Sequence, residues 1–232
     1  MKIVCIICEG PTEAKFVKTI LQPYFYSKNG TTIIPITLST SSPTNMAHKG
    51  GAINFDRYED RVLFFLYNKN NIVTSMIDFY KLDTDFPDYK ESKKITEIYK
   101  KVEFLENAIK EKIGRKVDVR RFLPYIQLHE FEALLFSDIK GFNTIYGIGD
   151  RDLKEIERII KENPNPELID DGEETHPAKR LLKIIRGYRK KVYGNMIAQK
   201  IGIETIMSKC PHFKEWIEKL VEMSKCDIEI IL

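Results

Sequence analysis

Acidic side chains follow three short apolar segments of this 232-residue sequence. Glu9 comes directly after the run 3–8, Asp78 follows the run 72–77, and HEFE at 129–132 follows the run 120–128. The first two runs are too short for a typical helix and rich in Ile and Val, and we interpret all three as strands of a mostly parallel sheet. Ligands bind at the carboxyl ends of such strands, so these acids are the first candidates for chemistry.

A cluster of carboxylates favours a divalent cation. Two carboxylates about 4 Å apart repel by roughly 4 kcal/mol at an effective dielectric near 20, so protons or a cation must neutralise a cluster of them. Ligand sets made only of oxygen suit Mg²⁺ or Mn²⁺. An acidic loop such as 79–89 is, taken alone, more often a solvated loop. The candidate metal ligands are Glu9, Asp78, Asp83, Asp85, Glu130 and Glu132.

Other roles are predicted for residues close to these acids. Glu9 is expected to act as a general base or as a metal ligand, and Glu13, one helical turn further on, is a second catalytic candidate. His129 is either a structural histidine or a proton carrier or metal ligand. Lys179 either lies on a solvated face or turns inward with Arg180 to stabilise charge in a transition state.

Basic and glycine-containing segments are candidates for binding nucleic acid. The net charge of +3 does not decide the question, so the distribution of charge matters more. A helix that opens at Pro177 carries a basic run, interpreted either as a phosphate-binding surface or as a solvated face. The loop 39–51 either approaches phosphates by its backbone or is an ordinary surface loop. The candidates are Lys49, Gly50, Gly51, Lys179, Arg180, Lys183 and Arg186.

The elements that must position these residues alternate between strands and helices. Strands are expected at 3–8, 31–38, 72–77 and 120–128. Helices are expected from Pro11 to about 21–23, at 55–68, 90–114, 133–136, 150–161 and 211–223, and from Pro177 onward. The predicted fold is α/β, with a mostly parallel sheet flanked by helices. Residues 1–140 are expected to form this core, and residues 141–232 a helical C-terminal region packed on it.

Composition narrows the class of protein. A sequence that is 43% hydrophobic and 31% charged is ordinary for a globular protein. It contains neither a membrane-span-length apolar run nor a signal-peptide pattern, so a cytoplasmic protein without a membrane partner is expected. The four cysteines are expected to be buried free thiols rather than a zinc site, with Cys5 and Cys8 on opposite faces of one strand.

Five motifs in order carry a resemblance to a known family: CEGPTEAKFV, IDFYKLDTDFP, PYIQLHEFEALLFSD, DDGEETHPAKR and CPHFKEWIEKL. Over nearly its whole length the chain resembles the bacterial and archaeal family catalogued as domain of unknown function 4276. That family is similar to the TOPRIM fold of topoisomerases, primases and overcoming-lysogenization-defect nucleases. The resemblance implies an Mg²⁺ site and association with ATPases in phage-defence operons.

The same resemblance assigns residues to the TOPRIM pattern. Glu9 matches the TOPRIM glutamate, and Asp78 with Asp83 or Asp85 stands for its aspartates. TOPRIM aspartates lie two residues apart, whereas Asp78 and Asp83 are five apart and only Asp83-Thr84-Asp85 has the literal spacing. Which pair binds metal therefore stays open at this point.

Three functions follow from these observations. The first is a nuclease that depends on Mg²⁺ or Mn²⁺ and cleaves DNA or RNA. The second is a nucleic-acid-binding or regulatory subunit that keeps a TOPRIM-like fold without catalysis, and the third is nucleotidyl or phosphoryl transfer on a small nucleotide. The sequence does not distinguish DNA from RNA, and it leaves the oligomeric state open.

Overall fold

The centre of the molecule is a parallel sheet. The computed structural model describes residues 2–38, 53–169, 172 and 176–225. The strand order is β2-β1-β3-β4, with β5 also pairing with β3, and every pairing is parallel. The strands are β1 Ile3–Cys8, β2 Thr32–Thr37, β3 Asn71–Asp78, β4 Phe122–Leu123 and β5 Ile126–Gln127. The predicted α/β class is confirmed.

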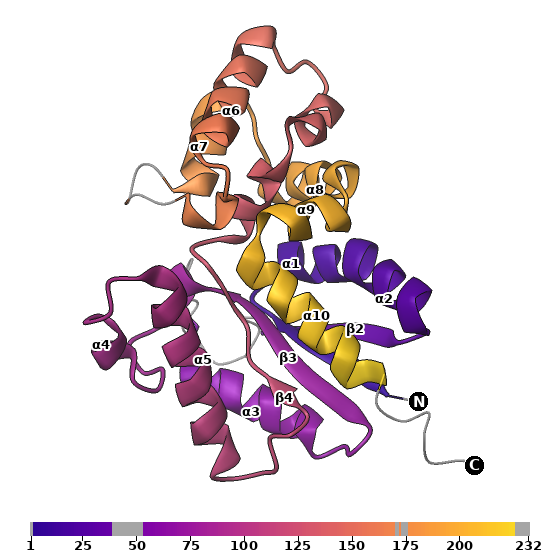
Figure 1. Cartoon of the computed structure of the whole chain (residues 1–232), viewed down its shortest axis with the longest axis vertical. Coiled ribbons are helices and arrows are strands. Elements are labelled where there is room, and N and C mark those ends of the chain that lie inside the picture. Colours follow the sequence, from indigo (N-terminus) through magenta and orange to yellow (C-terminus); the bar gives the residue numbers. More distant parts are fainter. Residues whose placement is uncertain (1, 39–52, 170–171, 173–175, 226–232) are drawn as a thin grey trace, which may run out of the picture.

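Helices cover both faces of this sheet (Figure 1). Every residue of β3 is buried, as expected for a central strand with two covered faces. On one face lie α3 (Phe55–Leu66) and α5 (Ile98–Gly114), which share a core with Cys5. The opposite face packs against α1 (Pro11–Phe16) and α10 (Pro211–Lys225), whose core includes Cys8. The two thiols therefore point to opposite faces, as the alternation along a strand predicts.

The first helical segment is longer than expected. After α1 the chain makes a π turn, Val17–Leu21, and continues into α2, Gln22–Asn29, instead of ending near residues 21–23. The N–H of Gln22 bonds to the carbonyl of Val17, five residues back, directly before Pro23. This wider turn lets the helix pass a residue that has no N–H to donate. The segment ends at Gly30, which has φ 71°.

Two other predicted elements are divided in the structure. The helix expected at 90–114 consists of a short α4, Tyr89–Ser92, and of α5, which begins at Ile98 because Glu97 accepts hydrogen bonds from the N–H groups of Tyr99 and Lys100. The strand expected at 120–128 is split into β4 and β5 around Pro124, which has no N–H for the sheet. There the side chain of Ser75 replaces a backbone partner, accepting from the N–H of Tyr125 and donating to its carbonyl, both at 3.0 Å.

The C-terminal region is helical, as predicted. Its helices are α6 Asp150–Glu162, α7 Pro177–Ile184, α8 Asn195–Ile201, α9 Ile203–Lys209 and α10. A π turn, Lys190–Gly194, precedes α8, and short 3₁₀ helices cover Phe79–Lys81, Phe131–Ser137, Ile139–Thr144 and Pro166–Leu168. Among the described helices, none has the length and apolar character needed to cross a membrane.

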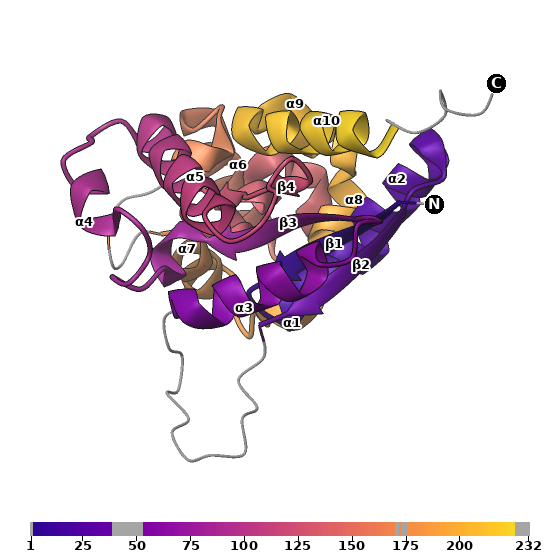
Figure 2. The same cartoon turned by 90° about the horizontal axis from the view of Figure 1, so that it is seen from below.

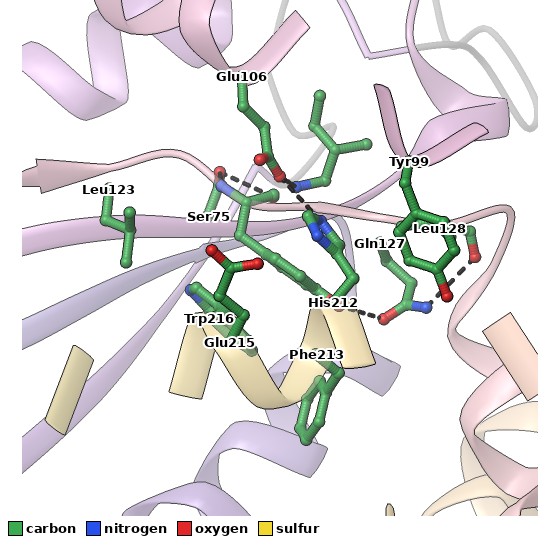
Figure 3. A network of polar contacts seen from close by, with 12 residues as sticks. Ser75, Tyr99, Glu106, Leu123, Gln127, Leu128, His212, Phe213, Glu215 and Trp216 are labelled. Carbon is green, nitrogen blue, oxygen red and sulfur yellow. Dashed lines mark hydrogen bonds and ion pairs between the residues drawn. The ribbon is translucent and has the colours of Figure 1, made fainter. Parts of the chain in front are cut away.

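Helix α10 is attached to the sheet by buried polar and aromatic contacts. Figure 2 shows it running alongside the strands. The indole N–H of Trp216 donates to Thr74 at 2.8 Å, and its ring stacks on Tyr125 with 4.2 Å between centroids. At the start of the helix, His212 Nε2 lies 3.1 Å from Glu106 Oε1 of α5 (Figure 3). One continuous core thus joins the two predicted regions, and a boundary near residue 140 stays a prediction.

Candidate active site

The carboxyl ends of β1 and β3 bring Glu9 and Asp78 together. The two strands are parallel neighbours with Cys8 opposite Met76, and the N–H of Glu9 donates to the carbonyl of Met76 at 3.3 Å. The carboxylate of Glu9 in turn interacts with the backbone N–H of Asp78. Acids that are 69 positions apart in the sequence therefore share one edge of the sheet, as the strand pattern predicted.

Glu13 is turned back toward this edge by the first turn of α1. Its Oε2 accepts a hydrogen bond from the N–H of Gly10 at 3.1 Å, which is the glutamate half of a capping box, since the glycine has no side chain to return a hydrogen bond. The side chain is almost completely buried, with the residue 3% exposed. A glutamate that would ordinarily lie on a solvated helix surface is thus placed beside the strand end.

Glu132 completes the group of acids from a third segment. It lies in the 3₁₀ helix Phe131–Ser137 and is fully buried. This helix is fixed to the sheet because Asp78 Oδ1 accepts from the N–H of Phe131 at 3.0 Å. We call Glu9, Glu13, Asp78 and Glu132 the acidic cluster.

The ammonium group of Lys190 lies among three members of the acidic cluster. Its Nζ is 2.9 Å from Glu132 Oε2, 3.7 Å from Glu13 Oε1 and 3.9 Å from Asp78 Oδ2. The lysine comes from the π turn that precedes α8, and its side chain is 36% exposed. A cation thus offsets part of the charge that would otherwise drive the cluster apart.

Burial and repulsion from neighbouring acids raise the pKa values of Glu9, Asp78 and Glu132. Burial, followed by the charge of Glu13, raises the pKa of Glu9 to about 7, against the opposing charges of Lys190 and Lys81. Burial also raises the pKa of Asp78 and of Glu132, and Lys190 opposes both shifts. Burial lowers the pKa of Lys190, but the carboxylates of Asp78, Glu132 and Glu13 outweigh it and hold that pKa above its ordinary value. Lys190 therefore stays charged.

Three oxygens of the cluster lack a hydrogen-bond donor. Glu9 Oε2, Asp78 Oδ2 and Glu132 Oε1 are buried, and none has a hydrogen-bond partner within the described part of the chain. Buried carboxylate oxygens without donors are expected where another positive group binds. The oxygen-only donor set suits Mg²⁺ or Mn²⁺. As arranged here, however, no three His, Cys, Asp or Glu side chains of the described residues are grouped closely enough to hold a metal ion.

The other acids predicted as ligands have different partners in this structure. Asp85 Oδ2 accepts from Asn54 Nδ2 at 2.6 Å and from the N–H of Phe55 at 2.9 Å, so it holds the start of α3. Asp83 Oδ1 accepts from the N–H of Thr84 at 2.6 Å, closing its own turn. Metal binding by either aspartate stays a prediction, and no contact of theirs with the acidic cluster supports it.

The side chains of the HEFE motif make different contacts. Glu130 Oε2 lies 2.9 Å from His176 Nδ1 and accepts from the N–H of Ala178 at 3.0 Å, which fixes the start of α7. His129 is 3% exposed, has φ 60°, and packs its ring against Tyr80 at 5.2 Å between centroids. Of this motif only Glu132 has a described ion pair with Lys190.

The basic residues are distributed differently from the prediction. Helix α7 ends at Ile184, so Arg186 lies beyond it and does not continue the helical face of Lys179 and Lys183; Gly187, with φ 75°, then redirects the chain. Lys179 and Arg180 are partly buried, and Lys183 and Arg186 are exposed. The candidates Lys49, Gly50 and Gly51 lie outside the described residues.

Sequence reasoning missed the role of Lys190. It is one of several cations in the basic run, and nothing in its local pattern distinguishes it from Lys191. Lys81 was also missed, although its charge lowers the pKa of Glu9. Its position three residues after Asp78 was the available signal, because the 3₁₀ turn Phe79–Lys81 keeps it near the strand end.

Comparison with known proteins places the chain in a family. No curated protein matches it. Among solved structures it is similar to the C-terminal region of the Xanthomonas campestris pv. campestris OLD protein, with 13% identity, a TM-score of 0.42, and coverage of 96% of this chain and 97% of that one. At this identity and TM-score the similarity assigns no role to any residue of the chain. The family model described as domain of unknown function (DUF4276) matches residues 8–221, and the chain therefore belongs to that family.

Proposed function

We propose that this protein is a TOPRIM-like nuclease that hydrolyses phosphodiester bonds of DNA or RNA with the help of Mg²⁺ or Mn²⁺. The observation that carries the proposal is the acidic cluster around Lys190. Four carboxylates from three segments share one edge of the sheet, and three of their buried oxygens have no hydrogen-bond donor within the described residues. Buried acids with raised pKa values, gathered at the ligand-binding edge of a sheet, are typical of a functional site.

The position of the Lys190 ammonium indicates where a metal ion would be held. Glu132, Glu13 and Asp78 surround that position, and we propose them as the metal ligands. When bound, the metal would polarise the phosphate and lower the pKa of an attacking water. Glu9, with a pKa of about 7, is suited to accept the proton of that water at neutral pH. Lys190 would have to give up that position to the metal, and its ammonium, held beside the site, would stabilise negative charge that develops on the phosphate.

A basic groove offers a place for the nucleic-acid backbone. Between α6 and α7 lies a groove of about 690 Å³. Its wall contains four cations and two acids, which favours a polyanion. The charged lining residues are Arg151, Lys154, Arg158, Lys183, Asp152 and Glu155. Of the predicted basic residues that the structure describes, Lys183 lines this groove, and its phosphate contact stays a prediction.

A second candidate function is a non-catalytic subunit that works through a partner, such as an ATPase. One observation favours it: the ammonium of Lys190 already lies where a metal ion would have to bind, and the described acids are not grouped to hold a metal as they stand. Under this alternative Lys190 is a permanent counter-ion and the acidic cluster serves stability or partner binding.

Two aspartate variants and one metal-binding measurement distinguish the candidates. Mn²⁺ binding to the wild-type protein is measured by calorimetry, and cleavage of single- and double-stranded DNA and RNA is followed with Mg²⁺ or Mn²⁺. The proposal predicts that Asp78→Asn loses both metal binding and cleavage. Asp83→Asn, the matched control, should keep both, because Asp83 bonds to its own turn.

The outcome is informative in either direction. If the wild-type protein binds no Mn²⁺ and cleaves no substrate, alone or with its partner, the nuclease proposal is wrong and the subunit is favoured. Loss of cleavage in Asp83→Asn with retention in Asp78→Asn would move the metal site to the literal Asp-x-Asp pair. Circular dichroism and thermal unfolding of each variant establish that it is folded.

A further inference from the structure

A second charged cavity lies away from the acidic cluster. It has a volume of about 460 Å³ and is enclosed by α3, the segment 85–88 and the C-terminal half of α5. None of the residues that line it belongs to the acidic cluster, and its walls come from the elements on the Cys5 face of the sheet. It is large enough for a small organic molecule or for one long side chain of another protein.

The wall of this cavity carries an excess of negative charge. Its acids are Asp56, Glu59, Asp85, Asp88 and Glu111, and its cations are Lys112, Arg115 and Lys116. Arg115 is already engaged, because it lies 2.7 Å from Glu111. The cavity as a whole therefore attracts a cation and disfavours a phosphate.

Glu59 is the residue that points to a ligand. It is only 6% exposed, and its Oε2 receives the ammonium of Lys116 at 2.8 Å. Its Oε1 is buried and has no hydrogen-bond partner among the residues that the structure describes. A buried carboxylate oxygen without a donor is costly, so a residue of the cavity wall that carries one is suited to accept a hydrogen bond from a bound ligand.

The geometry is better suited to an organic cation than to a metal ion. Within the described chain, no three acidic or other ligating side chains are grouped to hold a metal, and this includes the acids of the cavity wall. One oxygen of Glu59 is already shared with Lys116, which leaves a single directional acceptor. A planar guanidinium or an ammonium group can donate to one acceptor and still contact other acids of the wall.

We propose that this cavity binds a cationic N–H donor group, guanidinium or ammonium, through Glu59. The group belongs either to a free small amine or to an arginine or lysine side chain of another protein, since both present the same chemistry. Lys116 competes for the same carboxylate from outside. The inference is independent of the nuclease proposal, because Glu59 has no described contact with the acidic cluster.

Calorimetric titration with agmatine, which carries both a guanidinium and an ammonium group, tests the proposal on the full chain. Wild-type protein should bind the probe at one site. Glu59→Gln should weaken binding by about tenfold or more, because a charge-assisted hydrogen bond is lost. Lys116→Met should strengthen binding, because the competing ammonium is removed. Glu218→Gln, an exposed substitution on α10, is the control and should leave binding unchanged.

The opposite responses of the two variants keep the test decisive even if Glu59→Gln is poorly folded. No binding to the wild-type protein, equal binding by Glu59→Gln, or weaker binding by Lys116→Met would each overturn the proposal. Competition by millimolar Mg²⁺ beyond that of an equal ionic strength of NaCl would also overturn it, since it would indicate a metal site. A capped Gly-Arg-Gly peptide distinguishes the sources: binding of this peptide indicates a protein-borne group, and binding of agmatine alone indicates a free amine.

Discussion

Replacing Lys190 by methionine removes the cation of the acidic cluster while keeping most of the side-chain volume. At an effective dielectric near 20, the separations of 2.9, 3.7 and 3.9 Å correspond to attractions of about 6, 4.5 and 4 kcal/mol with Glu132, Glu13 and Asp78. These values are upper bounds, because the lysine side chain is 36% exposed and water screens it. The acids can also take up protons when the cation is gone.

We therefore expect Lys190→Met to lower the free energy of unfolding by about 2–4 kcal/mol at pH 8 without metal. The loss should shrink as the pH falls. Burial already raises the pKa of Asp78 and Glu132, and removing Lys190 raises both further. The folded variant then binds more protons than its unfolded chain above the ordinary carboxyl pKa, so its stability falls as pH rises. The difference from wild type should be largest at pH 8 and about 1 kcal/mol or less near pH 5.

Urea unfolding in EDTA measures this difference, with the single tryptophan, buried Trp216, as the fluorescence probe. Lys191→Met is the matched control, because its side chain is exposed and adjacent in sequence. It should change the unfolding free energy by about 0.5 kcal/mol or less. Equal losses in the two variants, or a loss in Lys190→Met that does not depend on pH, would refute the described placement of Lys190.

Three further predictions concern other parts of the molecule. Burial lowers the pKa of His212, but the hydrogen bond and charge of Glu106 outweigh burial and leave that pKa raised. The protonated histidine should therefore stabilise the fold fully below the ordinary histidine pKa, and this stabilisation should be lost as pH rises through the pKa of the folded state. The free energy of unfolding of His212→Gln should differ more from that of the wild type at pH 5.5 than at pH 8.5. Gly141→Ala should destabilise by about 1–3 kcal/mol in the same assay, since its Cβ would lie 2.7 Å from side-chain atoms of α8. If the basic groove holds DNA phosphates, the double variant Lys154→Ala, Lys183→Ala should make the slope of log affinity against log salt less steep by about two. An unchanged slope would contradict this role of the groove.

Local patterns were sufficient for the strands and for part of the site. The apolar run Ile3–Cys8 is a strand with the predicted bounds, and β3 ends at Asp78. Because a parallel sheet gathers the carboxyl ends of its strands at one edge, the meeting of Glu9 with Asp78 follows from those two runs. Element boundaries set by single side chains were harder to predict. The later start of α5 depends on Glu97, whose side chain caps the helix. The division between β4 and β5 depends on Pro124 and on the side chain of Ser75.

Only the tertiary structure distinguished residues whose local patterns are alike. Glu130 and Glu132 are two positions apart in HEFE, yet Glu130 holds the start of α7 while Glu132 faces Lys190. Asp85 has the spacing of a metal-binding pair, but its carboxylate holds the start of α3. Lys190 is one of a run of similar cations, and it reaches the acidic cluster because α7 ends at Ile184 and the π turn that follows directs this lysine there. The sequence therefore determined that acids collect at the sheet edge. Which cation joins them depends on packing between distant segments, and a local sequence pattern contains no information on that packing.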